Sequence, residues 1–174
     1  MEYKEILYSV KNKVAKITLN RPERLNAWTV LLMEEFHDAL NVAEADENVR
    51  VVLITGAGEK AFSAGFDLSL DDDIYGQKYA DSNTAEHRSA MQGAINLALR
   101  IWDYPKPTVA AIPGYCLAVA TEVIQMSDVI IASENAVFGE PEIRHHSGPA
   151  VFTTPWIIGI HKAKELLLTG DSVR

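Results

Sequence analysis

Two glutamates in the second half of the chain stand in settings that suit proton transfer. Glu122 falls in the first turn of a predicted helix, directly after a turn rich in glycine and alanine, and Glu142 falls in a proline-braced loop after a predicted strand. Two carboxylates in one partly dry pocket divide the roles of general acid and general base, because like charge and desolvation push their pKa values apart. An acidic side chain also suits a helix N-terminus for electrostatic reasons alone, and a loop glutamate is often only solvated. The spacing therefore leaves open whether the two carboxylates meet.

A second motif, residues 56–61 (GAGEKA), matches the dinucleotide-binding pattern G-x-G-x-x-G/A after a predicted strand. Its chemistry requires a helix directly after the glycines, because the helix N-terminus holds the pyrophosphate. Residues 62–67 carry a glycine in their middle and lack helical periodicity, so a simple turn is favoured over a dinucleotide site.

Metal and disulfide chemistry have little support in the sequence. His145 and His146 are adjacent and point apart in most backbones, and no Cys/His cluster has the spacing of a zinc site. The single cysteine, Cys116, has no partner within the chain for a disulfide. We therefore expect no metal.

Length and charge narrow the class of protein. With 174 residues the chain is expected to form one domain over residues 1–174. Its 16 basic and 24 acidic residues give a net charge of −8, which argues against nucleic acid as a partner. The first residues do not resemble a signal peptide, and no apolar run approaches the roughly 20 residues that span a bilayer, so no membrane association and a cytoplasmic location are expected.

The elements that must position these residues follow a simple order. Hydrophobic patterning predicts strands over 6–10, 14–19, 50–55, 108–112, 128–132 and 136–138. It predicts helices over about 29–44, 84–102, 118–126, 150–158 (interrupted by Pro155) and 162–168, and a polar loop over 69–83. The order is strand, strand, helix, repeated about four times, which indicates an α/β protein.

Seven segments in this order resemble the crotonase superfamily, the enoyl-CoA hydratase/isomerase family, and they cover nearly the whole chain. They are residues 19–27 (LNRPERLNA), 51–56 (VVLITG), 60–67 (KAFSAGFD), 105–115 (PKPTVAAIPGY), 122–132 (EVIQMSDVIIA), 138–143 (FGEPEI) and 166–171 (LLLTGD). The resemblance implies a crotonase-like (ClpP/crotonase) right-handed spiral of strand–strand–helix units. It also implies that relatives continue with a C-terminal helical region that these 174 residues lack.

The resemblance further implies a coenzyme A thioester substrate, no separate cofactor, and assembly into a homo-oligomer, a trimer or a dimer of trimers. By motif position, the backbone N–H groups of Phe66 and Val119 form an oxyanion hole, and Glu122 and Glu142 are the catalytic carboxylates. Relatives usually carry consecutive glycines where this chain has Ala118-Val119-Ala120. The residues implied to contact the substrate or its coenzyme A part are Arg24, Leu25, Ala64, Phe66, Asp67, Leu68 and Ser69.

The resemblance, with the implied oxyanion hole and two carboxylates, predicts a hydratase-like lyase that adds water to a 2-enoyl-CoA thioester, as in fatty acid metabolism. Our hypothesis is that Glu142 acts as acid or base at the α-carbon and Glu122 holds and activates the water, with swapped or shared roles open. An isomerase or thioester hydrolase of the same family is an alternative. A non-catalytic module that binds an acyl-CoA or a protein is favoured by the Ala-Val-Ala segment and the short chain, and a dinucleotide oxidoreductase is a distant third. We expect the loop over 69–84 to line the acyl pocket.

Overall fold

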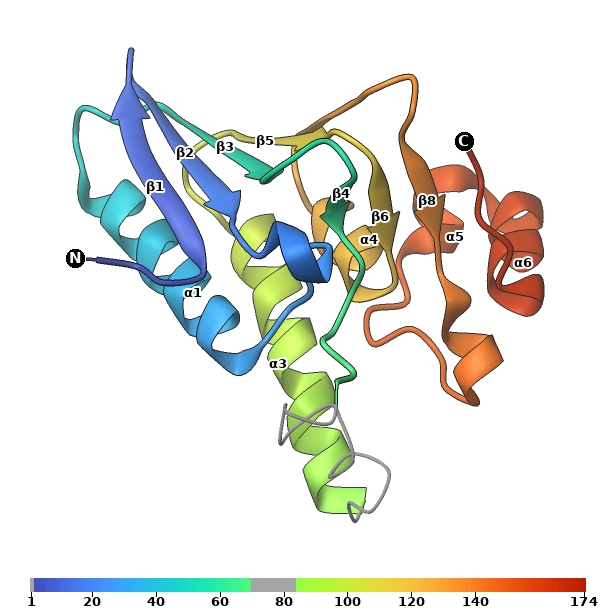
Figure 1. Cartoon of the computed structure of the whole chain (residues 1–174). Helices are drawn as coiled ribbons and strands as arrows, with labels where there is room; N and C mark the ends of the chain where they lie inside the picture. The colour runs from blue at the N-terminus through green and yellow to red at the C-terminus, as the bar shows by residue number, and fades with distance from the viewer. Residues whose placement is uncertain (1, 70–83) are drawn as a thin grey trace.

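The computed structural model describes residues 2–69 and 84–174, and within them strands and helices follow the expected strand–strand–helix order (Figure 1). The predicted acyl-pocket loop lies almost wholly outside these residues. The strands are β1 (Ile6–Lys11), β2 (Val14–Leu19), β3 (Val51–Gly56), β4 (Ala61–Ser63), β5 (Thr108–Ile112), β6 (Tyr115–Leu117), β7 (Val129–Ala132) and β8 (Val137–Gly139). The helices are α1 (Val30–Ala45), α3 (Thr84–Trp102), α4 (Val119–Ile124), α5 (Thr154–Ile158) and α6 (Ile160–Thr169), with 3-10 turns η1 (Pro22–Arg24) and η2 (Pro141–His145).

The strands form two sheets. The larger sheet has the order β1-β2-β3-β5-β7, in which only the β1–β2 hairpin is antiparallel. The smaller sheet has the order β4-β6-β8 and is parallel throughout. From β3 onward, the first strand of each unit enters the larger sheet and the second strand enters the smaller one. This alternation confirms the repeating unit read from the sequence.

The core lies between the larger sheet and its helices. Helix α1 begins after Thr29, whose side chain caps it by accepting a hydrogen bond from the Leu32 N–H at 3.0 Å. Its buried residues recur at spacings of three and four, as the sequence predicted, and are Leu32, Phe36, Ala39, Leu40 and Ala43. Figure 1 shows α1 and α3 side by side beneath this sheet, and the two helices contact each other.

Several local predictions were wrong, and each failure has a physical reason. Strands β4 and β6 were missed because three residues are too few to show alternation, and their pairing comes from distant segments. Pro155 does not interrupt a helix but stands in the first turn of α5, where its missing N–H is not needed. The loop that carries Glu142 is the 3-10 turn η2. The segment after residues 56–58 forms β4, so the helix that the dinucleotide pattern requires does not follow these glycines.

Among the described residues, no helix is both long and apolar enough to cross a membrane.

Candidate active site

The candidate residues lie where the three strands of the smaller sheet end. Residues 64–66 follow β4, residues 118–119 follow β6, and residues 140–142 follow β8. Because these strands are parallel, their carboxyl ends lie at one edge of the sheet, the edge at which open α/β sheets usually bind ligands. The fold therefore collects residues that are far apart in the sequence at one edge.

The first two of these segments touch each other at Gly65 and Ala118. A Cβ atom on Gly65 would lie 2.8 Å from the Ala118 Cβ and 3.2 Å from the Leu117 carbonyl oxygen, and Gly65 has a φ of +94°. Both the contact and the backbone conformation therefore require glycine. Since Phe66 and Val119 are the next residues in each segment, the close approach brings the backbones of the two predicted oxyanion-hole residues together.

Hydrogen bonds with the segment before α1 fix the direction of the Phe66 amide. The Trp28 N–H donates to the Gly65 carbonyl at 2.8 Å, and the Asp67 N–H donates to the Trp28 carbonyl at 2.9 Å. Successive amides of an extended strand point to opposite sides, so the Phe66 N–H points away from Trp28.

The Val119 amide opens helix α4, where the first N–H groups have no partner within the helix. Val119 is the first residue of the helix, and the unusual conformation falls on the preceding residue, Ala118, with φ 56° and ψ −137°. This is a region that glycine normally occupies, and it carries strain of about 1–3 kcal/mol for other residues. The alanine at this position is therefore held there by its surroundings, which include the hydrogen bond from its N–H to the Gly139 carbonyl at 2.8 Å.

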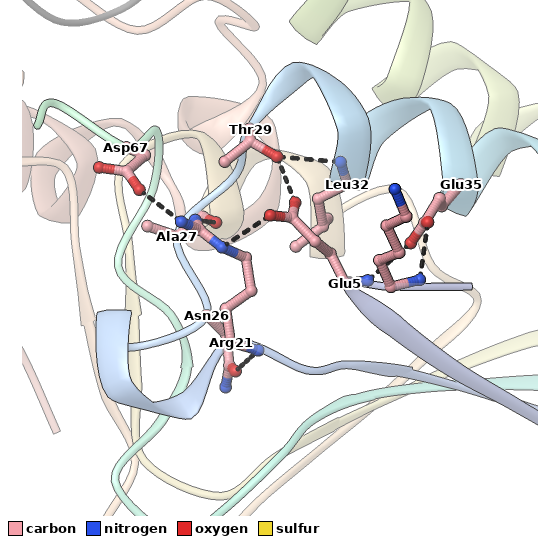
Figure 2. Close-up of polar contacts among 9 residues, drawn as sticks. Glu5, Arg21, Asn26, Ala27, Thr29, Leu32, Glu35 and Asp67 are labelled. Atoms are coloured by element: carbon pink, nitrogen blue, oxygen red, sulfur yellow. Dashed lines mark hydrogen bonds and ion pairs between the residues drawn. The ribbon is translucent and has the colours of Figure 1, made fainter. Parts of the chain in front are cut away.

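A charged network braces the segment of residues 64–67 through Asp67 (Figure 2). Arg21 forms ion pairs with Asp67 at 2.8 Å and with Glu5 at 3.1 Å, and it also donates to the Ala27 carbonyl at 2.7 Å. Glu5 in turn accepts a hydrogen bond from the Thr29 hydroxyl, the cap of α1. Burial raises the pKa of Asp67, but hydrogen bonds from Ser69 and the Arg21 guanidinium outweigh it and lower that pKa below its ordinary value. Arg21 is a positioning residue that the sequence interpretation missed.

The residues predicted to contact coenzyme A lie on two adjoining segments. Arg24 and Leu25 are exposed at the end of η1, and the Leu25 carbonyl accepts a hydrogen bond from the Ala64 N–H at 3.0 Å. Leu68 is exposed after the segment that carries Phe66. Asp67 differs from these residues, because its carboxylate is buried in the ion pair with Arg21 and accepts from the Ser69 N–H at 3.0 Å.

On the other side of the edge, Glu122 is buried and held by two backbone amides. Its carboxylate accepts hydrogen bonds from the Ala150 N–H at 3.1 Å and the Val151 N–H at 2.6 Å, and the residue is 1% exposed. Burial raises the pKa of Glu122 to about 8, helped by the negative charges of Glu142 and Glu140 and opposed by the two amides. The neighbouring charge shows that Glu122 and Glu142 lie within electrostatic reach of each other.

Glu142 stands on η2, which is anchored at its far end by an ion pair between Arg144 and Asp171 after α6. One carboxylate oxygen, Oε2, is buried and has no hydrogen-bond partner among the described residues. Burial raises the pKa of Glu142 to about 7, and the charge of Glu140 adds to the effect. The site thus holds two carboxyl groups whose pKa values lie near neutrality.

Glu140 is a third buried carboxylate that the sequence interpretation did not single out. It lies between β8 and η2 and accepts a hydrogen bond from the Thr154 hydroxyl. Its position two residues before Glu142 was the only signal available, because burial of a loop residue is set by distant segments. His145 and His146 are both exposed, and the described residues contain no group of three or more His, Cys, Asp or Glu side chains arranged around a metal position.

Comparison with known proteins places this geometry in a family. The family profile described as "Enoyl-CoA hydratase/isomerase" matches residues 9–174. The chain belongs to the enoyl-CoA hydratase/isomerase family. A "Probable enoyl-CoA hydratase" from Rhizobium meliloti is 35% identical over 173 residues, which are 98% of this chain and 63% of that protein. A "Short-chain-enoyl-CoA hydratase" from Clostridium acetobutylicum is 32% identical over 177 residues, covering 100% of this chain and 65% of the relative.

Solved structures of the family share the fold. The crystal structure of an enoyl-CoA hydratase/isomerase from Xanthobacter autotrophicus Py2 superposes with a TM-score of 0.90 at 41% identity, covering 98% of this chain and 61% of that one. The enoyl-CoA hydratase from Bacillus anthracis gives a TM-score of 0.86 at 33% identity, covering 98% and 64%. The predicted crotonase-like spiral is therefore confirmed. The chain spans less than two thirds of the length of these relatives.

Proposed function

We propose that this site adds water to the double bond of a 2-enoyl-CoA thioester. The observation that carries the proposal is the pairing of Glu122 and Glu142. They are two carboxyl groups from separate elements, with pKa values raised to about 8 and about 7, at the edge where the Phe66 and Val119 backbones converge. The relatives with enoyl-CoA hydratase in their names support it.

The amides act on the thioester. Addition of water to the β-carbon moves negative charge onto the thioester oxygen, giving an enolate-like transition state. The N–H groups of Phe66 and Val119 donate to that oxygen, and each such donor is worth about 3–4 kcal/mol of transition-state stabilisation. Residues 66–69, with Ala64 before them, lie along the bound thioester, and Arg24 and Leu25 lie near its pantetheine or nucleotide part.

The carboxyl groups divide the proton transfers. Glu122, held by two amides, orients the water and takes its proton while the oxygen bonds to the β-carbon. Glu142, with one buried oxygen not engaged by the described residues, gives a proton to the α-carbon. The two groups titrate as a coupled pair that starts the reaction with one proton. The two amides that donate to Glu122 favour its ionised form, so we place that proton on Glu142. Each transfer contributes roughly 10²–10⁴-fold to the rate.

The remaining expectations stay proposals for the protein as a whole. The reaction consumes only the thioester and water, so we propose no additional cofactor. We also propose that the chain is one domain of a cytoplasmic trimer or dimer of trimers, as its resemblance to the family implies.

The test follows the loss of the conjugated-thioester absorbance of a short 2-enoyl-CoA. The wild-type chain is expected to exceed Glu122→Gln and Glu142→Gln by at least 10²-fold, whereas Glu47→Gln, an exposed glutamate after α1, is expected to match wild type. Equal rates in all four proteins contradict the assignment.

One observation favours the binding module as a second candidate. Ala118 places a methyl group against Gly65, directly beside the amides that must grip the thioester oxygen. If that methyl group blocks the oxygen, a saturated acyl-CoA binds in calorimetric titration while the 2-enoyl-CoA is not turned over. Turnover by the wild-type chain excludes this candidate.

A further inference from the structure

Glu140 is a buried acid that the hydration mechanism does not use. It is 1% exposed, and its Oε1 accepts a hydrogen bond from the Thr154 hydroxyl. Its Oε2 is buried without a hydrogen-bond partner among residues 2–69 and 84–174. A buried carboxyl group with one free oxygen either carries a proton or places an uncompensated charge on its neighbours.

A neutral hydrogen-bond network fixes Glu140 to the segments that hold the catalytic pair. The Gln125 amide donates to the Thr154 hydroxyl oxygen at 3.1 Å, and the Thr153 hydroxyl donates to the Gln125 carbonyl oxygen at 2.9 Å. Gln125 follows Glu122 by about one helical turn, and the two threonines lie two and three residues after Val151, whose amide donates to Glu122. The network therefore joins the helix of Glu122, the clamp on Glu122 and the strand end that leads to Glu142.

The charged groups that shift the pKa values of Glu122 and Glu142 are all carboxylates. Burial raises the pKa of Glu140 while Thr154 and Gln125 oppose it, and its charge raises the pKa of both Glu122 and Glu142. In the described part of the chain, no lysine, arginine or histidine forms an ion pair with any of these glutamates. Three like carboxyl groups in one buried region do not ionise independently.

We propose that Glu140 is a positioning residue whose buried carboxylate, fixed by Thr154 and Gln125, sets how protons are shared between Glu122 and Glu142. The inference rests on the proposed hydration, since it names the residue that keeps one proton on the pair at neutral pH. It requires that Glu140 be ionised in the working pH range, held so by the Thr154 hydroxyl.

The experiment compares pH–rate profiles of wild type and Glu140→Gln. Glutamine keeps the shape and can accept from Thr154, but it removes the charge, so both limbs of the profile are expected to move to lower pH by about one unit. Above the basic limb the activity then falls about tenfold relative to wild type. Glu140→Asp retains the charge and is expected to restore the wild-type profile, even if kcat falls because the shorter side chain reaches Thr154 less well.

Two further variants separate this role from a structural one. Thr154→Val removes the hydroxyl that favours ionised Glu140, so a smaller shift of both limbs to lower pH is expected. This variant also tests the inference if Glu140→Gln does not fold. Glu134→Gln removes an exposed carboxylate ahead of β8, and its profile is expected to match wild type. Lower activity with unmoved limbs in Glu140→Gln and Thr154→Val overturns the inference.

A measurement that does not depend on turnover separates failure of the Glu140 inference from failure of the proposed hydration. Titration of glutamate carboxyl carbons by NMR reports the protonation of Glu122 and Glu142 directly. A wild-type chain without hydratase activity removes the proposed function, whatever the titrations show. Carboxyl titrations that are unchanged by Glu140→Gln remove the present inference, even in an active enzyme.

Discussion

The two sides of the candidate active site are held by different interactions, ion pairs on one side and neutral hydrogen-bond donors on the other. The amide side, residues 64–67 and 118–119, is braced by Arg21, whose positive charge lies between Asp67 and Glu5. The carboxyl side, Glu122, Glu140 and Glu142 with the clamp at 150–154, is held by neutral donors, with no ion pair to the three glutamates in the described residues.

The difference fits what each side must do in the proposed reaction. A donor of hydrogen bonds needs a fixed direction and no change of charge, and hydrogen bonds from Ser69 and Arg21 lower the pKa of Asp67 below its ordinary value despite burial. A proton-transfer group needs a pKa near the working pH, which burial among like charges provides for Glu122 and Glu142. Ion pairs therefore hold the amide side in place, whereas the acids of the carboxyl side, which lack ion pairs in the described residues, can gain and lose protons near neutral pH.

The largest effect is expected from breaking the charged brace. Arg21→Met leaves Asp67 and Glu5 as neighbouring acids without their cation, and we expect a loss of about 3–5 kcal/mol in the free energy of unfolding. Denaturant unfolding at pH 7 measures it. Arg50→Met, at an exposed arginine before β3, is the matched control and should change stability by less than about 0.5 kcal/mol. A similar small change in Arg21→Met would show that the ion pairs do not hold the loop.

A somewhat smaller effect is expected where the two amide segments touch. Gly65→Ala places a methyl group 2.8 Å from the Ala118 Cβ at a φ of +94°. Strain and overpacking together predict a loss of about 2–4 kcal/mol in stability and a strong fall in hydration rate. Gly148→Ala is the control, because nothing lies within 4 Å of its added Cβ. Unfolding curves and the absorbance assay report both quantities; equal behaviour of the two variants would mean that the segments do not meet.

The smallest effect, taken per pH unit and per group, is the fall in stability with rising pH that the carboxyl side contributes. Because folding raises the pKa of Glu122 to about 8 and of Glu142 to about 7, the folded chain keeps protons that the unfolded chain releases above the ordinary value of 4.5. Stability therefore falls as pH rises through this window, by up to about 1.4 kcal/mol per pH unit for each group. Asp67, with a lowered pKa, contributes the opposite slope, and only in acid.

The control for this slope is the double variant Glu122→Gln/Glu142→Gln. It lacks both titrating groups, so its free energy of unfolding should decline less between pH 5 and pH 8 than that of wild type. Denaturant unfolding at several pH values measures the difference. Parallel curves for the two proteins would show that these carboxyl groups have ordinary pKa values.

How much the sequence revealed depended on whether a feature was local. Helix α1 and its Thr29 cap could be predicted because apolar spacing and capping are written in consecutive residues. Strands β4 and β6 could not, since three residues become a strand only through pairing with distant partners. Glu122 and Glu142 were predicted by resemblance to a family, whereas Glu140 and Arg21 owe their roles to burial and to ion pairs that join segments far apart in the chain.

The segment after α6 is coupled to the smaller sheet. Val173 pairs with Phe138 on β8 through two backbone hydrogen bonds of 2.8 Å, so it lies beside the strand that leads to Glu140 and Glu142. Val173→Pro would remove the N–H that donates to the Phe138 carbonyl, one of these two hydrogen bonds. The resulting distortion would reach Glu140 and Glu142 through β8.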